Sequence, residues 1–307
     1  MCLVSYSKKE QYSSKNKLNN FDNSPKWAYV EITSSCSHKC AWCYGGFNED
    51  KQEYMSVEDF ETLANKCVDI GIKQVTLSGG EPTEHPYFKE ILAIACQHFT
   101  VNIATHGDWT EDFSGLLYLL GVKQVQFNYQ GSKRHDGVHK VDSYQKQLES
   151  MKSVKKLGID VVGTVTVGAY NLRDISDIFK ELDTIGVSRL RVWEATGVGN
   201  KFRKELEAKQ IFDHCTESAA KFGYTYIQSY DPIVEGDVGV KCLSLSKLYM
   251  YINSKCQVIY CGAVESELDK PFSDFKTDSP KEILTNYINY MDSKQRDKPY
   301  CAARSEE

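Results

Sequence analysis

The sequence predicts an α/β protein built mainly from consecutive βαβ units, followed by a small α+β extension. Strand-like and helix-like segments alternate six times along the first two thirds of the chain. Hydrophobic residues make up 41% of the 307 residues and charged residues 26%, which is ordinary for a globular domain. Because strand–helix–strand units form parallel sheets with right-handed crossovers, we expect six parallel strands covered by helices.

The six strands of the repeating region are short runs, such as Trp27–Thr33, that are rich in β-branched and aromatic residues. They are Trp27–Thr33, Gln74–Ser78, Thr100–Thr105, Lys123–Tyr129, Asp160–Val167 and Ser188–Glu194. The carboxyl ends of such strands carry the active sites of β/α barrels, so the segments that follow them are the first place to look for function.

Five helices are predicted between these strands. They are Val57–Ile70, Tyr87–Cys96, Glu111–Leu120, Ser143–Leu157 and Leu172–Ile185. The last two are followed by Gly158 and Gly186, and glycine at this position is a common helix C-cap.

The two ends of the chain differ from this pattern. Residues 1–24 are polar and rich in Lys, Asn and Ser, so we expect a flexible leader, and they lack the apolar core of a signal peptide. From residue 204 the rhythm changes to helix Glu205–Phe222, strand Tyr224–Ser229, a hairpin of Tyr249–Ile252 and Val258–Tyr260, and helix Pro280–Asp292. We therefore expect a barrel domain over residues 25–203 and a small C-terminal module over residues 204–307.

Charge and hydropathy exclude several classes of protein. The net charge is −5 and the basic clusters are short, so we expect no nucleic-acid partner. No apolar run has the length of a membrane span, so we expect no membrane partner and a cytoplasmic location. In that reducing compartment the 11 cysteines are expected to be thiols or cluster ligands rather than disulfides.

Three cysteines form the most informative motif. Cys36, Cys40 and Cys43 follow the first strand with the spacing C-x₃-C-x₂-C, which places three thiolates on one short loop. Three thiolates suit a four-iron cluster in which one iron has no protein ligand. Zinc sites usually use paired C-x₂-C units, and no second pair exists here. The motif therefore predicts a cluster whose open iron can bind a small molecule.

This cysteine loop resembles that of the radical S-adenosylmethionine (SAM) family. The resemblance implies a partial (β/α)₆ barrel and a [4Fe-4S] cluster whose open iron binds SAM. It also implies reductive cleavage of SAM to a 5′-deoxyadenosyl radical, which abstracts a substrate hydrogen atom. The electron would come from an external donor of the flavodoxin or ferredoxin type.

The same resemblance assigns a set of SAM-binding residues. Ser78-Gly79-Gly80-Glu81-Pro82 follows the second strand, where two glycines permit close backbone approach and a glutamate faces the SAM ammonium group in the family. Relatives often carry Thr-Asn-Gly where Thr105-His106-Gly107 stands here, and a polar residue at Asn128 typically reaches the ribose. The expected contacts are Tyr44, Gly79, Gly80, Glu81, Pro82, Thr105, Asn128, Gln130 and Gly197. His38 receives no ligand role, because that position varies in the family.

The C-terminal cysteines resemble the SPASM/Twitch module, which holds auxiliary clusters. Cys242, Cys261 and Cys301 are the preferred ligands of one auxiliary [4Fe-4S] cluster in a shorter, Twitch-like form. Cys256 stands where the module usually has glycine, so it is a fourth ligand, a redox-active thiol or a packing residue. The alternative is that all four are free thiols.

Candidate catalytic residues lie at strand ends. Glu31, Tyr129 and Glu194 are expected inside the barrel mouth, with His135, Asp136 and His139 on a following loop. Charges in that position are costly unless they are used or paired, and the glutamates could instead pair with Arg189 or Arg191.

Three functions are compatible with these motifs. The first is a radical SAM enzyme that modifies a peptide or protein. The second is a radical SAM enzyme acting on a sugar, aminoglycoside or tetrapyrrole. The third is a non-enzymatic iron–sulfur or zinc protein in redox sensing or assembly, which explains the cysteines but not Gly79-Gly80-Glu81 at a strand end.

Overall fold

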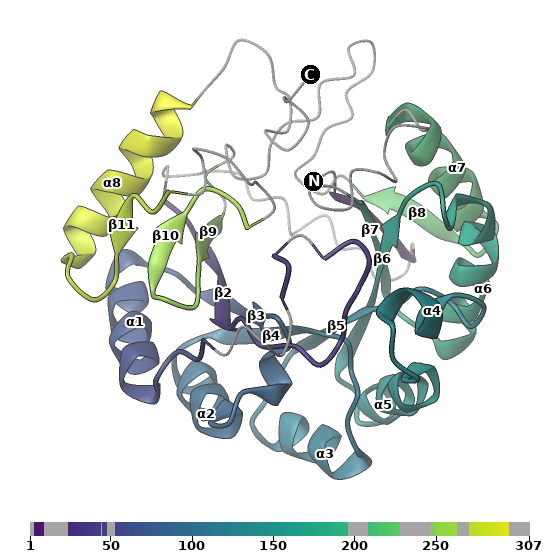
Figure 1. The fold of residues 1–307 in the computed structure, drawn as a ribbon, viewed down its shortest axis with the longest axis horizontal. Coiled ribbons are helices and arrows are strands. Elements are labelled where there is room, and N and C mark those ends of the chain that lie inside the picture. Colours follow the sequence, from purple (N-terminus) through teal and green to yellow (C-terminus); the bar gives the residue numbers. More distant parts are fainter. Residues whose placement is uncertain are drawn as a thin grey trace.

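A computed structural model describes residues 3–8, 24–43, 45–47, 53–195, 208–227, 247, 249–262 and 270–294. Its strands form one curved sheet, and the helices cover the outer, convex face of that sheet (Figure 1). The predicted α/β class with a partial barrel is confirmed.

Six parallel strands form the centre of the sheet, in the order of the chain from β2 to β7. They are β2 Trp27–Thr33, β3 Gln74–Gly79, β4 Thr100–Thr105, β5 Gln124–Asn128, β6 Asp160–Val167 and β7 Arg189–Glu194. All six predicted strands are present, and their bounds differ from the prediction by at most one residue at either end.

The helices between these strands were also predicted, apart from two short ones. They are α1 Val57–Ile70, α2 Phe88–His98, α3 Glu111–Leu119, α5 Tyr144–Lys156 and α6 Ile175–Ile185. Two short additions, the 3₁₀ turn Pro82–Glu84 and helix α4 His135–His139, lie in segments expected to be loops. Both border the site described below.

Local signals explain where the helices begin and end. Ser56 caps α1 by accepting a hydrogen bond from the Asp59 backbone N–H, at 3.0 Å. Gly158 (φ 81°) follows α5, and Gly186 (φ 82°) caps α6, in the left-handed conformation expected of them.

The N-terminal segment is more ordered than predicted. β1, Leu3–Lys8, pairs antiparallel with β7 on one side and with β8, Tyr224–Ile227, on the other. The expectation of a flexible leader is therefore wrong for these six residues. Tyr6 explains the order, because its ring is fully buried beside Phe179 and its hydroxyl hydrogen-bonds Thr216 at 3.1 Å.

The C-terminal elements extend the same sheet at both edges. Helix α7, Ala208–Ala220, leads into β8, while β9, Tyr249–Ile252, pairs in parallel with β2. Strands β10 Gln257–Ile259 and β11 Ser273–Asp274 continue from β9, and helix α8, Pro280–Ser293, packs against α1. The described strands after residue 203 are thus continuous with the barrel sheet.

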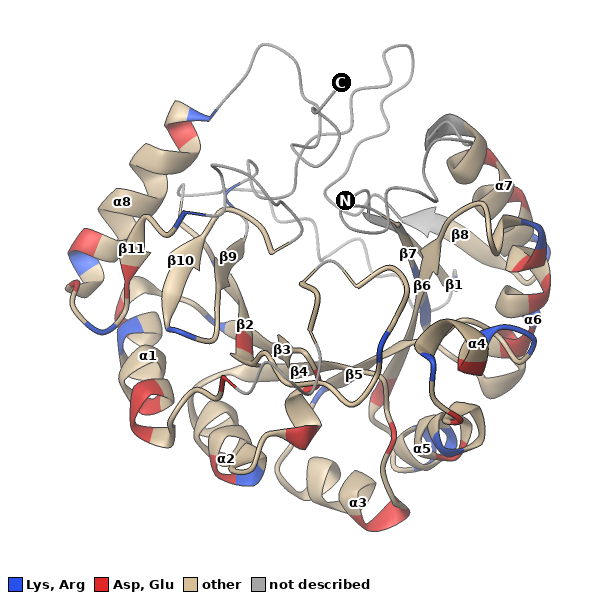
Figure 2. Ribbon diagram, viewed as in Figure 1, with Lys and Arg blue, Asp and Glu red and all other residues tan. Residues whose placement is uncertain are grey.

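Strand alternation separates two environments. On β2, Ala28, Val30 and Ile32 face the apolar core under the helices, whereas Tyr29 lines the cavity inside the curve. Acidic and basic residues are intermixed along the outer helices (Figure 2). The interior face of the sheet carries many polar side chains and is where a ligand can enter.

Within the described part of the chain, every helix is too short or too polar to cross a membrane.

Candidate active site

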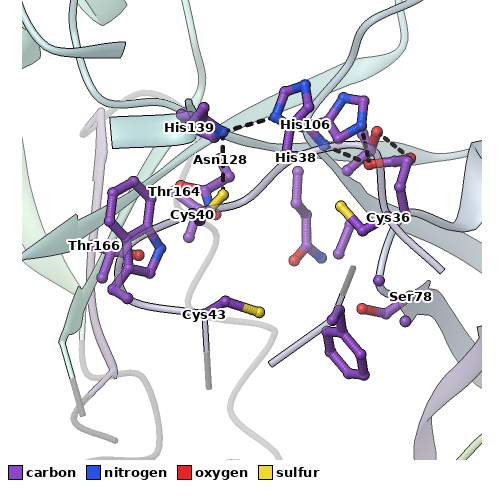
Figure 3. A pocket seen from close by; sticks show the side chains of 18 of the residues that line it. Cys36, His38, Cys40, Cys43, Ser78, His106, Asn128, His139, Thr164 and Thr166 are labelled. Carbon is purple, nitrogen blue, oxygen red and sulfur yellow. Dashed lines mark hydrogen bonds and ion pairs between the residues drawn. The ribbon is translucent and has the colours of Figure 1, made fainter. Parts of the chain in front are cut away.

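A cavity lies inside the curved sheet, toward the carboxyl ends of the strands. Its wall combines the cysteine loop with inward-facing residues of successive strands, including Ser78, Asn128, Thr164 and Thr166 (Figure 3). This is the position at which β/α barrels build active sites. All three predicted cluster cysteines line it.

The three thiols are largely buried and carry raised pKa values. Burial is the main cause, and it raises the pKa of Cys40 to about 12 and raises those of Cys36 and Cys43. Thiols in such a place are neutral unless a cation is present, and metal coordination deprotonates them. Among the described residues, the cavity wall holds these three thiols and no fourth, so the donor set fits a four-iron cluster with one open iron.

Gly79, the last residue of β3, and Gly80, the next residue, make room for the cysteine loop. A Cβ on Gly79 would lie 2.2 Å from the Thr33 carbonyl oxygen, and one on Gly80 would lie 2.1 Å from the Ser35 carbonyl oxygen. The Gly80 N–H donates to Thr33 O at 2.8 Å, and the Glu81 N–H donates to Ser35 O at 2.9 Å. The glycines therefore let the backbone before Cys36 cross the end of β3 at close range.

Glu81 lies in the cavity wall, but its carboxylate is engaged by the protein. It accepts hydrogen bonds from the hydroxyls of Thr83 (2.6 Å) and Thr105 (2.7 Å) and from the His106 N–H (2.8 Å), and the residue is fully buried. Thr105 also lines the cavity, whereas Pro82 begins the 3₁₀ turn. These bonds tie β4 to the Gly-Gly-Glu run.

Glu84 and His106 form a polar brace that the sequence did not identify. Glu84 accepts from the Ser37 N–H at 2.9 Å and from the Ser37 hydroxyl, and it contacts His106 Nε2 at 3.2 Å. Burial would lower the pKa of His106, but the carboxylates of Glu81 and Glu84 outweigh it and raise that pKa. Burial alone would raise the pKa of Glu84, but the hydrogen bonds from His106 and Ser37 hold that pKa below its usual value. The brace fixes the loop beside Cys36.

Asn128, the last residue of β5, and Gln130, two residues later, were both expected to contact SAM, but they lie in different places. Asn128 lines the cavity. Gln130 is fully buried and is not among the described residues of the cavity wall. It hydrogen-bonds Asn128 and Asn171, at 3.0 Å each, and so connects the end of β5 to the loop after β6. The predicted contact residues Tyr44 and Gly197 lie outside the described residues.

The three candidate catalytic residues also differ in where the structure places them. Tyr129 is wrong as a barrel-mouth residue, because the pleat turns it into the core with Phe127, where its hydroxyl donates to Glu181 at 2.6 Å. Glu31 is buried and accepts a hydrogen bond from the Tyr251 hydroxyl of β9. The side chain of Glu194, at the end of β7, lies outside what the structure describes.

Of the four C-terminal cysteines, two are described. Cys256 is buried in the β9–β10 turn with φ 66°, a left-handed conformation that favours glycine. Its pKa is raised to about 12 by burial, and it packs in the apolar core that includes Cys67 of α1. Cys261 is half-buried after β10, while Cys242 and Cys301 lie outside the described residues.

Helix α4 brings two histidines to the cysteine loop. His135 and His139 are four residues apart, so they share one helix face, and both are fully buried. Asp136 instead accepts hydrogen bonds from the backbone of Ser143 and Tyr144, at 2.9 Å each, and holds the start of α5. The i, i+4 spacing of the histidines was the available signal for this helix face.

Sequence comparison with curated proteins supplies two informative relatives. The sporulation killing factor maturation protein SkfB of Bacillus subtilis is 26% identical over 174 residues, which are 55% of this chain and 42% of SkfB. A probable GTP 3′,8-cyclase of Saccharolobus islandicus is 26% identical over 202 residues, 62% of this chain and 65% of the cyclase. The chain thus spans less than two thirds of the length of these relatives.

Structure comparison and a family model agree with this site. Streptococcus suis SuiB, solved with its precursor peptide SuiA, superposes with a TM-score of 0.71 at 15% identity, over 93% of this chain and 75% of SuiB, which shows the shared fold. The model of the radical SAM superfamily matches residues 30–182, a range that contains the cysteine loop, Gly79-Gly80-Glu81 and strands β3 to β6. With three cysteines at the mouth of a six-stranded parallel barrel, residues 30–182 of the chain belong to the radical SAM superfamily.

Proposed function

We propose that this protein is a radical SAM enzyme that abstracts a hydrogen atom from a peptide or protein substrate. The observation that carries the proposal is the joint placement of Cys36, Cys40 and Cys43 on one cavity with the Gly79-Gly80 crossing beneath them. The chemistry supplied by a bound [4Fe-4S] cluster and SAM is reductive cleavage of SAM to a 5′-deoxyadenosyl radical, with the electron from a flavodoxin- or ferredoxin-type donor.

The chain's own residues bind and orient the ligands and exclude water from them. The three cysteines would hold the cluster, while Asn128, Thr164 and Thr166 present hydrogen-bonding groups to a polar ligand in the same cavity. Trp42 is 6% exposed and stacks on Tyr170 at 5.7 Å, so it shields this side of the cysteine loop from water.

A peptide substrate is supported by the relatives. SkfB is named as a maturation protein, and SuiB was solved with a precursor peptide. The competing proposal of a small-molecule substrate is supported by the similarity to probable GTP 3′,8-cyclases. We place peptide modification first and propose a cytoplasmic location, where thiols and clusters stay reduced.

An auxiliary [4Fe-4S] cluster is the second part of the proposal. Cys261 follows β10, and β9, the other strand of this hairpin, is hydrogen-bonded to β2 of the barrel. A cluster held by Cys242, Cys261 and Cys301 would therefore belong to a segment attached directly to the barrel edge. We leave Cys256 out of that ligand set, because it is buried in the core that includes Cys67 of α1.

The central test is formation of 5′-deoxyadenosine. The wild-type protein, reconstituted anaerobically with iron and sulfide and given SAM and dithionite, should release 5′-deoxyadenosine, measured by mass spectrometry. The variant with Cys36, Cys40 and Cys43 all changed to Ala should release none. Cys96→Ala is the matched control, since Cys96 lies on α2 away from the cavity wall. Equal product from the triple variant would refute the proposal, as would zinc in place of iron in the wild type.

A further inference from the structure

Four histidines form a buried cluster beside the cysteine loop, and the proposed function does not use it. This imidazole cluster consists of His38, His106, His135 and His139, none more than 7% exposed. His38 stacks on His106 with ring centroids 3.7 Å apart, and His135 stacks on His139 at 4.1 Å. The edge contact between His38 and His139, at 5.0 Å, joins the two pairs. Such a cluster is costly to bury, so its contacts call for a physical explanation.

One nitrogen of the cluster touches a predicted cluster ligand. His139 Nδ1 lies 3.4 Å from Cys40 Sγ and 2.9 Å from His38 Nδ1 (Figure 3). Among the described residues, Cys40 is the one of the three loop cysteines whose sulfur has a side-chain hydrogen-bond contact. The imidazole cluster therefore acts on one particular thiol.

The backbone holds this contact in place from both sides. The Lys39 N–H donates to the His139 carbonyl oxygen at 3.1 Å, and the Ala41 N–H donates to the Val138 carbonyl oxygen at 3.3 Å. Residues on both sides of Cys40 are thus pinned to the end of α4. A fixed distance between His139 and Cys40 follows from these two bonds.

The proton arrangement follows from the sulfur. The 2.9 Å contact between His38 Nδ1 and His139 Nδ1 is a hydrogen bond, so one of these two nitrogens carries the proton and the other accepts it. Nε2 of both rings is buried without a hydrogen-bond partner, so either tautomer pair leaves one N–H unpaired. With Cys40 as a thiolate, a lone pair on His139 Nδ1 would face a negative sulfur. The tautomer with the proton on His139 Nδ1 turns this repulsion into a hydrogen bond.

We propose that His139 is a positioning residue that donates its Nδ1–H to the Cys40 thiolate, and that His38 accepts from the same N–H and fixes the tautomer. Hydrogen bonds to cluster sulfurs stabilise the more negative, reduced state and so raise the reduction potential. The inference rests on the proposed function, because it requires the cluster that Cys40 would help to hold.

A mononuclear metal site is the competing explanation. His38, Cys40 and His139 offer three ligand atoms within 4.8 Å of one another. However, two nitrogens bound to one tetrahedral zinc ion at about 2.05 Å lie roughly 3.3 Å apart. The observed Nδ1–Nδ1 distance of 2.9 Å is instead that of a hydrogen bond. We therefore favour the hydrogen bond, and zinc content becomes an outcome of the test.

The test measures the midpoint potential of the reconstituted cluster without SAM, by redox titration followed by electron paramagnetic resonance. His139→Phe should lower the potential while iron content stays at the wild-type level. His139→Asn, whose Nδ2 can stand where Nδ1 stood, should recover part of the shift. His98→Phe is the control, since His98 lies on α2, outside the imidazole cluster and the cavity wall, and should leave the potential unchanged.

A second measurement does not depend on the folding of a variant. In the reduced wild type, pulsed resonance spectroscopy should detect an exchangeable proton coupled to the cluster that disappears in deuterated buffer. An unchanged potential in His139→Phe, or the absence of that proton, would overturn the inference while leaving the proposed function intact. One zinc per chain in the isolated wild type, lost in His139→Asn, would also overturn it. A wild type that assembles no cluster would refute the proposed function itself.

Discussion

At the scale of single residues, the site depends on groups that hold the cysteine loop as much as on the cysteines. Glu81 was predicted to face the SAM ammonium group, but its carboxylate already accepts bonds from Thr83, Thr105 and His106. The residue type and its position after a strand were readable from the sequence. Its partners were not, because hydrogen bonds between strand ends depend on sheet order.

Gly80 tests this supporting role. Gly80→Ala should lower iron incorporation and destabilise the protein by about 1–3 kcal/mol, because the new Cβ would lie 2.1 Å from Ser35 O and 3.0 Å from Cys36 Cβ. Gly115→Ala in α3 is the control, since no atom lies within 4 Å of its added Cβ. That control should be neutral or stabilising by up to about 1 kcal/mol. Iron analysis and urea unfolding measure both effects, and equal iron content in the two variants would contradict the expectation.

The brace between His106 and Glu84 predicts a pH dependence. The pKa of His106 is raised, so its contribution to stability is complete below its ordinary value of 6.5 and is lost as pH rises through the folded value. The pKa of Glu84 is lowered, so its contribution is present above 4.5 and is lost as pH falls through its folded value. Glu81, Asp108 and His38 also face His106.

The corresponding comparison uses His106→Asn, which removes the imidazole charge and keeps a polar side chain. In the metal-free protein, wild type should exceed the variant in free energy of unfolding by on the order of 1 kcal/mol at about pH 5.5. The difference should shrink at about pH 8.5, as measured by urea titration. A difference that stays constant or grows with pH would show that the His106 charge does not stabilise the fold.

At the scale of elements, periodicity predicted the parallel strands well but could not assign every face. Lys123–Tyr129 was read as a strand whose end enters the barrel mouth, yet the pleat points Asn128 inward and Tyr129 into the core. A shift of one residue decides which side chain faces the cavity. The sequence does not show this, because both faces of the strand carry residues that tolerate burial. The short strand β1 was not predicted from the sequence. Two of its six residues are serines, and it lies in a polar segment, so its apolar pattern is weak.

Strand β1 provides an element-scale prediction. It joins β7 to β8 by hydrogen bonds on both sides, so loss of its buried anchor should loosen that edge. Tyr6→Ala should destabilise the protein by about 3–5 kcal/mol, as for other large-to-small changes of aromatic core residues. Tyr118→Ala, which removes a 55% exposed ring on α3, should cost less than about 0.5 kcal/mol. Equal urea midpoints for the two variants would show that β1 does not support the sheet.

At the scale of the whole molecule, the barrel and its C-terminal extension share one sheet. The change of rhythm near residue 204 indicated a separate module, but β9 pairs with β2 and β8 joins through β1. Sequence patterns report which segments are strands, whereas pairing between distant segments depends on contacts that leave no local signal. An auxiliary cluster in this extension would therefore lie on the same rigid frame as the SAM site.

Iron stoichiometry decides whether that cluster exists. The reconstituted wild type should hold about eight irons per chain, from two four-iron clusters. Cys261→Ala should lose one cluster, whereas Cys256→Ala should keep both, because Cys256 is buried in the core that includes Cys67 of α1. Cys256→Gly should also keep both and should not destabilise the turn through its backbone, since φ is 66° there. About four irons per chain in the wild type would refute the auxiliary cluster, and the extension would then act only as a wall of the barrel.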